Sequence, residues 1–497
     1  MTRMAFKTRL AFTALLAGTA LVPGMAQAQA QTAREIELET RLKALEAAVQ
    51  DLRGELNAAR ATAAAPIAPT AMNPAPMNTN PMNPASMNTN PMTASSMSVA
   101  SESPGRSPGA TNVAQAKPVA ANSAPTDGFR VGNTTVKVGG FVRLNVIASR
   151  YSDGEAAVGG LGKEFFLPQQ IPVGGGFSTQ DLLLSARQTR LQFSTSTPMN
   201  GTDIKTLVEF DFALATAPVG AQRATNPYTP TFRRGFIEYG NLLVGQEWST
   251  FQNIAVLPET TDFVGPLDGT VFNRQAQVRY TIPLRSGLTL QIAAENPETE
   301  TALPANAALV DTDDDRLPDV VARVNWKPTF GDFALAGIAR ELRTDTLGSG
   351  DTAFGWGVSG SGKIPIGKRH DLRFMATYGQ GIGRYLGLGY VPDAIYGGTA
   401  TQLERIDNFA AFAAFRIGWT DAIHSTLMGS YQSANYPAGV IVTGLANAKS
   451  YGGAGNLFWS PGKGFDIGVE YRHAVRELVS GDTGALDRLE FAFKYGF

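Results

Sequence analysis

From Gly128 onward the sequence alternates apolar and polar residues with a period of two. Successive side chains of a β-strand point to opposite faces, so each alternating segment predicts a strand with one apolar and one polar face. The last segment shows this most clearly. Its two faces are Leu489, Phe491, Phe493, Tyr495 and Phe497 against Arg488, Glu490, Ala492 and Lys494. Charge confined to one face of a segment of about ten residues is typical of a membrane barrel, whereas strands of a soluble sandwich are shorter.

About sixteen such segments follow one another along the chain. They start near Val136, Ser185, Asp203, Phe232, Leu242, Arg274, Leu288, Asp319, Gly331, Thr352, His370, Asn408, Ala422, Ala448, Phe465 and Asp487. Short connections, such as Gly240-Asn241, alternate with long ones, such as Ser249–Asn273. This order predicts an all-β transmembrane barrel of about 16 antiparallel, up-and-down strands over residues 128–497.

A barrel of this size encloses an aqueous channel rather than a packed core. An even strand number places both ends of the barrel on the periplasmic side of an outer membrane. Composition agrees with this fold, because alternating strands average to a mean hydropathy near zero, here −0.08. The chain has no cysteine and a formal net charge of −1. We therefore expect neither disulfides nor a nucleic-acid partner.

The first 30 residues have the order of a secretory signal peptide. Lys7 and Arg9 precede an apolar run from Leu10 to Val22, and small residues follow at Ala26–Ala30. The run is shorter than the roughly 20 residues that a membrane-spanning helix needs. No later segment has that length and apolar character, so a closed barrel is the expected way of crossing a membrane.

Residues 31–60 predict a short coiled coil on the periplasmic side. Its apolar seam has spacings of four and three, at Leu38, Leu42, Leu45, Val49, Leu52 and Leu56. A narrow seam on so short a helix needs partners, and we favour self-association over a helix that lies on its own domain. The seam alone does not distinguish two strands from three.

Residues 61–127 predict a disordered linker rich in Ala, Pro, Asn, Ser and Met. A ten-residue repeat occupies Met72–Pro81 and Met82–Pro91. Methionine thioethers suit Cu(I), but no His or Cys assists them and their spacing follows the repeat. We therefore expect no metal site there.

Several motifs resemble the DcaP-type porins. They are Gly128–Thr134, Val138–Arg143, Val244–Phe251, Leu257–Phe263, Arg274–Tyr280 and Glu295–Thr299. The resemblance implies a homotrimer of 16-stranded barrels that takes up small anionic solutes, with dicarboxylates as the family example. The terminal Phe497 resembles the aromatic signal by which the barrel-assembly machinery recognises such chains for insertion. The long linker departs from the family pattern.

Strand parity predicts which charged residues face the barrel interior. The basic ones are Arg143, Arg190, Arg279, Arg323, Arg340, Arg373, Arg416, Arg472 and Lys205. Acidic residues on the same face are Glu209, Asp211, Glu238, Asp466 and Glu470. Two interpretations stay open and are compatible. The arginines form a ladder that concentrates anions and holds carboxylates, or they pair with the acidic residues and stabilise the wall.

The resemblance implies that the long connection Ser249–Asn273 is the constriction loop, since the third external loop of trimeric porins folds inward. It carries the acidic residues Glu259, Asp262 and Asp268. If these faced Arg143, Arg190 and Arg279, they would create a field across the channel.

Signatures of catalysis and of metal binding are missing from the sequence. The three histidines lie on different segments, and Asp311–Asp315 opens like a calcium loop but has Arg316 and Ala322 where that motif needs Gly and Glu. We therefore expect no catalytic residue, metal or cofactor.

The expected function is that of an outer-membrane porin of a Gram-negative bacterium. It would pass small hydrophilic solutes by passive diffusion, favour anions, and contact outer-membrane lipids and lipopolysaccharide. The alternative is a trimeric barrel that anchors a structural tether or adhesin with a coiled-coil stalk.

Overall fold

The computed structural model describes residues 128–213, 225–306, 308–311, 314–345, 350–397 and 402–497. The predicted signal peptide, coiled coil and linker lie outside the described residues. Those three assignments therefore stay predictions.

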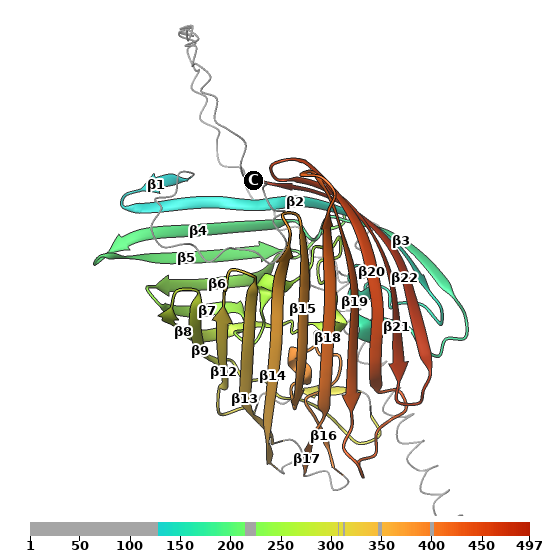
Figure 1. Ribbon diagram of the computed structural model, residues 1–497. Coiled ribbons are helices and arrows are strands. Elements are labelled where there is room, and N and C mark those ends of the chain that lie inside the picture. The colour runs from blue at the N-terminus through green and yellow to red at the C-terminus, as the bar shows by residue number, and fades with distance from the viewer. Residues whose placement is uncertain (1–127, 214–224, 307, 312–313, 346–349, 398–401) are drawn as a thin grey trace, which may run out of the picture. The chain divides into compact units, whose positions relative to one another are not determined.

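The described residues form one closed antiparallel β-barrel (Figure 1). In chain order, the wall strands are β2 (Thr134–Tyr151), β3 (Thr179–Ser185) with β4 (Arg190–Met199), β5 (Thr202–Asp211), β6 (Thr231–Tyr239), β7 (Leu242–Trp248), β8 (Arg274–Arg285), β9 (Leu288–Glu295), β12 (Asp319–Trp326), β13 (Asp332–Thr344), β14 (Asp351–Ile366), β15 (His370–Gln380), β18 (Asp407–Gly418), β19 (Ile423–Asn435), β20 (Asn447–Gly462), β21 (Phe465–Leu478) and β22 (Thr483–Gly496).

Pairing of β2 with β22 closes the barrel. The described sheet has 18 strands, but β1 (Phe129–Val131) only extends the start of β2. Strands β3 and β4 pair with successive parts of β2 and together make one wall strand. The wall therefore has sixteen strands within the described residues, and the predicted fold class is confirmed.

Burial along the strands is the reverse of that in a soluble protein. On β22, Phe491 and Phe493 are 40% and 41% exposed, whereas Glu490 and Ala492 are 2% and 3% exposed. An apolar outer face and a polar inner face are what a barrel needs when lipid surrounds it. Within the described residues, no helix has the length and apolar character needed to cross a membrane.

Predicted strand positions agree with the observed ones to within a few residues, with one clear correction. The second wall strand begins at Thr179 rather than near Ser185, and it is interrupted between Ser185 and Arg190. At the interruption Thr189 N donates to Ala186 O at 3.0 Å. The break turns the polar side chains of consecutive residues inward, which strand periodicity does not allow.

Loop lengths also alternate less strictly than expected. We call the end of the barrel that carries Phe497 the turn end and the opposite end the loop end. Two connections at the loop end are short. One runs from the end of β13 at Thr344 to the start of β14 at Asp351, and the other from the end of β21 at Leu478 to the start of β22 at Thr483.

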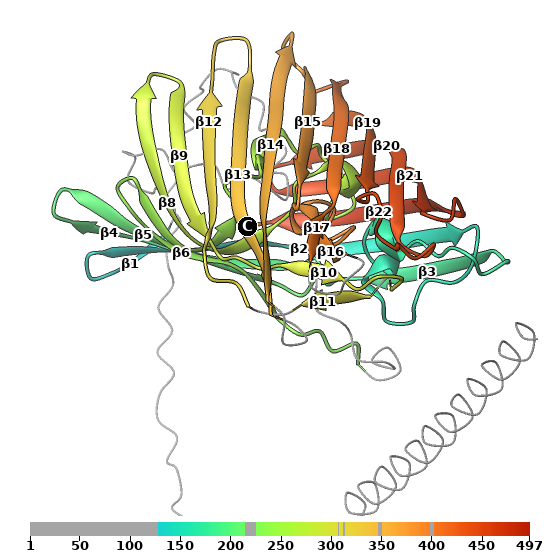
Figure 2. The ribbon, with the colours of Figure 1, turned by 90° about the horizontal axis from the view of Figure 1, so that it is seen from below.

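Two long loops at the loop end share a small four-stranded sheet (Figure 2). Its strands are β10 (Glu300–Ala302), β11 (Leu309–Asp311), β16 (Ala394–Tyr396) and β17 (Leu403–Arg405). Parallel pairing of β10 with β16 joins the loop after β9 to the loop after β15. The two loops therefore hold each other in place.

Apolar packing occurs between the wall and the loops. Short 3-10 turns shape these loops: η1 (Leu161–Lys163), η2 (Pro168–Gln170), η4 (Ile254–Val256), η5 (Leu267–Gly269) and η7 (Gly383–Tyr385). One apolar cluster combines Phe251 and Tyr385 from loops with Phe412 from β18. A second combines Phe166 and Phe263 from loops with Trp248 at the end of β7. The interior is thus partly filled by loop residues.

Candidate functional site

The 249–273 loop crosses the barrel interior and is bonded to the wall on several sides. It begins and ends at one root, where Ser249 N donates to Asn273 O at 3.0 Å. Inward-facing side chains of four wall strands donate to its carbonyl groups. These are Arg143 (β2) to Thr261, Arg323 (β12) to Gln252, Arg373 (β15) to Leu257 at 2.6 Å, and Asn456 (β20) to Glu259 at 2.7 Å. Such a loop narrows the interior at the height of these contacts.

Glu259 anchors this loop through three basic side chains. Its carboxylate lies 3.7 Å from Arg373 Nη2, 3.4 Å from Arg416 Nε and 2.5 Å from His424 Nε2. Burial by itself raises the pKa of Glu259, but the hydrogen bond with His424 and the charges of the two arginines lower it to about 2. The carboxylate therefore stays ionised and holds the loop against β15, β18 and β19.

Asp262 and Asp268 hold other parts of the same loop. Asp262 accepts a hydrogen bond from Phe166 N at 2.7 Å and lies 3.7 Å from Arg488 Nη1. Asp268 is fully buried and accepts a hydrogen bond from Ser450 at 3.0 Å. Burial raises the pKa of Asp268. Both carboxylates therefore face the protein rather than an open lumen.

The sequence left open which cations these acidic residues meet. Among the described residues, none of the three forms an ion pair with Arg143, Arg190 or Arg279, the cations considered from the sequence. The physical reason is the path of the loop. Its η5 turn packs against β18 and β19. Glu259 meets Arg373, Arg416 and His424 on β15, β18 and β19, whereas Asp262 meets Arg488 on β22.

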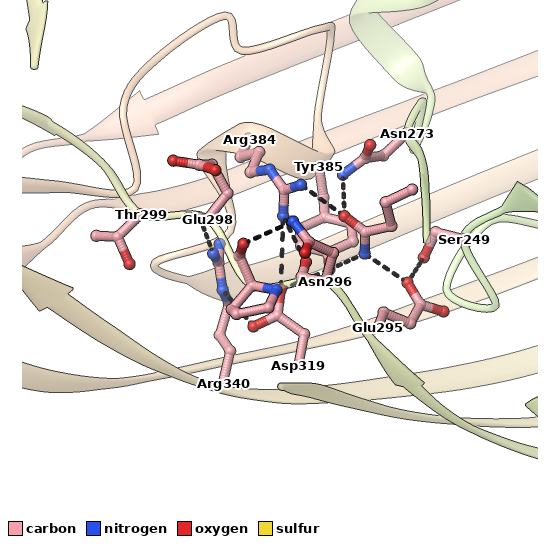
Figure 3. Close-up of polar contacts among 12 residues, drawn as sticks. Ser249, Asn273, Glu295, Asn296, Glu298, Thr299, Asp319, Arg340, Arg384 and Tyr385 are labelled. Carbon is pink, nitrogen blue, oxygen red and sulfur yellow. Dashed lines mark hydrogen bonds and ion pairs between the residues drawn. The ribbon is translucent and has the colours of Figure 1, made fainter. Parts of the chain in front are cut away.

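A second polar network ties the loop that carries η7 to β12 and β13 (Figure 3). Arg340 is buried and lies 3.2 Å from Asp319 and 3.0 Å from Asp393. Tyr385 donates to Asp319 at 2.6 Å, and Arg384 lies 3.7 Å from the same carboxylate. Figure 3 shows the side chains of Asp319, Arg340, Arg384 and Tyr385 converging from separate segments. The network fixes the loop to the inner face of the wall.

A third cluster lies where β5 and β7 end and β6 begins. A β-bulge makes Arg233 an extra residue in β6, so Arg233 and Arg234 both point inward. Arg233 lies 2.8 Å from Glu209 and 2.5 Å from Asp211. Arg234 forms a bidentate pair with Glu247, with contacts of 2.7 and 2.5 Å. Alternation along β6 without the bulge would not predict that Arg233 points inward.

The basic residues that parity placed inside fall into two groups. The first group is paired with carboxylates and comprises Arg190 with Asp211 at 3.4 Å, Arg340 with Asp319 at 3.2 Å, Arg373 with Asp371 at 2.6 Å, Arg416 with Glu259 at 3.4 Å and Arg472 with Glu470 at 3.0 Å. The second group has no carboxylate at ion-pair distance in the described part of the chain and comprises Arg143, Lys205, Arg279 and Arg323.

Two arginines of the second group flank β9 on its two neighbouring strands. Arg323 of β12 donates to the amide oxygen of Gln291 at 3.1 and 2.6 Å, and Asn325 donates to the same oxygen at 3.2 Å. Arg279 of β8 is only partly buried, and its side chain makes no hydrogen bond or ion pair within the described residues. Neutral partners thus hold Arg323 without cancelling its charge, and Arg279 keeps its donors available.

Several interior residues were not singled out from the sequence. They are Arg187, Arg233, Arg234, His424 and Arg488. Parity already placed Arg488 on the polar face of β22, so that signal was present. Arg187 lies in the interruption between β3 and β4, where periodicity fails. Within the described residues, no group of three or more His, Cys, Asp or Glu side chains is placed to hold a metal ion.

Comparisons with known proteins agree with this architecture. A family model described as DcaP outer membrane protein matches residues 131–497. Among solved structures, the outer membrane channel DcaP of Acinetobacter baumannii is 22% identical, with a TM-score of 0.61 over 74% of this chain and 99% of that chain. This likeness shows the shared fold.

More distant solved structures also match. An anion-selective porin from Comamonas acidovorans is 10% identical, with a TM-score of 0.45 over 73% of this chain and all of that chain. The trimer form of OmpT of Vibrio cholerae is 11% identical, with a TM-score of 0.45 over 73% of this chain and 99% of that chain. A search of curated proteins gave no match.

Proposed function

Because the chain belongs to the DcaP outer membrane protein family, we propose that it is an outer-membrane porin whose channel favours small anions, dicarboxylates among them. The family and the closed sixteen-stranded barrel support the porin and its place in the outer membrane. Transport here is passive diffusion without catalysis. The anion preference rests on the interior of this chain.

The observation that carries the anion preference is the pair Arg279 and Arg323. Neither has a carboxylate at ion-pair distance among the described residues. The nearby Glu295 is already engaged, because it accepts from Ser249 at 2.7 Å and from Thr250 N at 2.6 Å. The positive charge of this part of the wall is therefore not cancelled by direct contacts.

Uncancelled guanidinium groups favour anions for two reasons. A channel with low-dielectric walls focuses their field and raises the local concentration of anions. The planar fork of guanidinium also holds a carboxylate with two parallel hydrogen bonds, which chloride does not offer. Arg279 and Arg323 lie on both sides of β9, so a solute with two carboxylates can engage both.

Assembly and surroundings follow from the same proposal. We propose a homotrimer that sits among outer-membrane lipids and lipopolysaccharide, is inserted by the barrel-assembly machinery, and keeps its N-terminal region in the periplasm. Phe497 would serve as the insertion signal. It is 57% exposed, and its backbone pairs with Gly140 at the closing seam.

The test is current through single channels in a planar bilayer that separates two concentrations of KCl. The proposal predicts stepwise openings, a reversal potential that shows preference for chloride, and block by added succinate. Openings that prefer potassium would keep the porin and overturn the role of the two arginines. A folded barrel without conductance would favour the alternative of an anchored tether or adhesin.

A further inference from the structure

Arginines outnumber carboxylates at the root of the 249–273 loop, where three of them are buried and Arg274 is partly exposed. Four guanidinium groups gather there, from Arg190, Arg233, Arg234 and Arg274, and the acidic residues beside them are Glu209, Asp211 and Glu247. Contacts of 3.8 Å or less distribute all three carboxylates among the first three arginines. One positive charge is left over, on Arg274.

Arg274 is the first residue of β8 and directly follows the loop. Within the described residues it has no carboxylate at ion-pair distance, and its strongest electrostatic repulsion comes from Arg233, followed by Arg190. Its Nη1 atom and Nη2 of Arg233 are both enclosed without a hydrogen-bond partner. Buried donors without partners are rare in native proteins and point to a missing acceptor.

Aromatic rings form the remaining surroundings of these two donors. The Trp248 ring lies 4.9 Å from Arg274 Cζ and 6.0 Å from Arg233 Cζ, and the Phe263 ring lies 4.8 Å from Arg233 Cζ. Phe272 packs edge-on against Trp248 at 5.0 Å. Such surroundings favour an ion that loses its water easily, because strongly hydrated ions pay a large desolvation penalty.

Among the described residues, no carboxylate that is free of other contacts lies at ion-pair distance from Arg274. The sequence between β5 and β6, residues 212–230, contains neither Asp nor Glu. Glu295, at the end of the neighbouring β9, is bonded to Ser249, Thr250 and Gln275. Within the described residues, no group of this chain supplies the missing acceptor.

We propose that a small, weakly hydrated monovalent anion of the halide class binds behind the 249–273 loop, between Arg274 and Arg233. It neutralises the excess charge and accepts hydrogen bonds from the two free N–H groups. Because both ends of the loop meet at this point, the anion stabilises the root of the constriction loop. This site is separate from the Arg279 and Arg323 pair and does not depend on the selectivity of the channel.

The test compares bromide with gluconate, which is too large and too hydrated for the site. Thermal unfolding of the detergent-solubilised protein is measured at constant ionic strength while one sodium salt replaces the other. A ligand that binds only the folded state raises the unfolding temperature, and we expect a saturable rise of at least about 2 °C in bromide. Arg274→Gln should abolish the rise. Arg285→Gln, an exposed change on the same strand, should leave it unchanged.

A crystal grown in bromide makes the test independent of how the variant folds. The proposal predicts an anomalous scattering peak within hydrogen-bond distance of Arg274 Nη1 and Arg233 Nη2 of the unmodified protein. No peak there, no effect of bromide on the unmodified protein, or an equal effect on Arg274→Gln would each overturn it. In those cases water would be the acceptor.

Discussion

Two sectors of the same barrel wall use arginine for different purposes. In the sector β15 to β21, Arg373, Arg416 and Arg472 are paired with carboxylates and hold the 249–273 loop or the wall. In the sector β8 to β12, Arg279 and Arg323 have no carboxylate at ion-pair distance among the described residues. The number of inward arginines therefore says little about selectivity, because the partner of each decides whether its charge reaches a solute.

The difference also separates stability from selectivity. When one partner of a buried arginine–carboxylate pair is removed, the other partner is left as an uncompensated charge. Removing an arginine of this kind should therefore cost stability. An arginine held by the neutral amide of Gln291, like Arg323, leaves no charge behind. Its loss should change the field in the channel and leave the acceptors of Gln291 and Gln252 without their donor, at a cost of about 1–3 kcal/mol, without stranding a charge.

The largest expected effect is on Arg340, which sits in the network of Figure 3. Arg340→Met leaves Asp319 and Asp393 buried without their main cation, and we expect a loss of about 3–5 kcal/mol in the free energy of unfolding. Urea titration in detergent, followed by the gel mobility of the folded barrel, measures it.

The matched control for that change is Arg369→Met at the turn end. Arg369 and Asp421 form an exposed pair, with side chains 49% and 68% exposed, so its removal should cost at most about 1 kcal/mol. If both variants lost the same free energy of unfolding, burial would not be what makes the Arg340 ion pairs important for stability.

Glu259→Gln should have the next largest effect. Lowering the pKa of Glu259 from its ordinary 4.5 to about 2 corresponds to about 3 kcal/mol of stability at neutral pH. The folded-state pKa lies below the unfolded one, so this contribution is full above about pH 4.5 and disappears as the pH falls towards 2. Unfolding titrations from pH 7 to pH 2.5 should show the decline in the unmodified protein and a weaker one in the variant. A parallel decline in both would contradict the role of this carboxylate.

A smaller loss is expected for Gln291→Leu, on the other side of the comparison. The change removes the oxygen that accepts from Arg323 and Asn325, which should cost about 1–2 kcal/mol. The freed guanidinium should also broaden the distribution of single-channel conductance. Conductance as uniform as that of the unmodified protein would mean that Gln291 does not position Arg323.

Arg416→Gln should have the smallest effect, below about 1 kcal/mol. The Arg416 side chain is 19% exposed, and Glu259 keeps Arg373 and His424 after the change. Urea titration again measures it. A loss as large as that of Glu259→Gln would show that Arg416, rather than Arg373 and His424, anchors the loop.

Strand order and strand parity were predictable from the sequence because the period of two is a direct property of the β-strand. The side that Arg143, Arg323 or Arg472 faces follows from that period alone. The bulge that brings in Arg233 and the interruption that turns Arg187 inward do not follow from it, since both break the period. These breaks depend on contacts between strands and loops that are distant in sequence.

The sequence alone could not identify the ion-pair partners of the inward arginines, for a related reason. Parity fixes the direction of a side chain, but the path of the 249–273 loop decides which carboxylate it meets. Glu259 could be placed in that loop from the sequence, and only the fold places it beside Arg373, Arg416 and His424. The division into compensated and uncompensated arginines is therefore a result of the tertiary structure.

The most direct test of that division is the reversal potential of the double variant Arg279→Gln with Arg323→Gln in a KCl gradient. The matched control removes two positive charges at exposed turns, as Lys327→Gln with Arg369→Gln, whose side chains are 57% and 49% exposed. We predict that the first double variant folds normally and loses the preference for chloride and the block by succinate, whereas the control keeps both. An unchanged reversal potential in the first double variant would contradict the central claim that these two arginines set the selectivity of the channel.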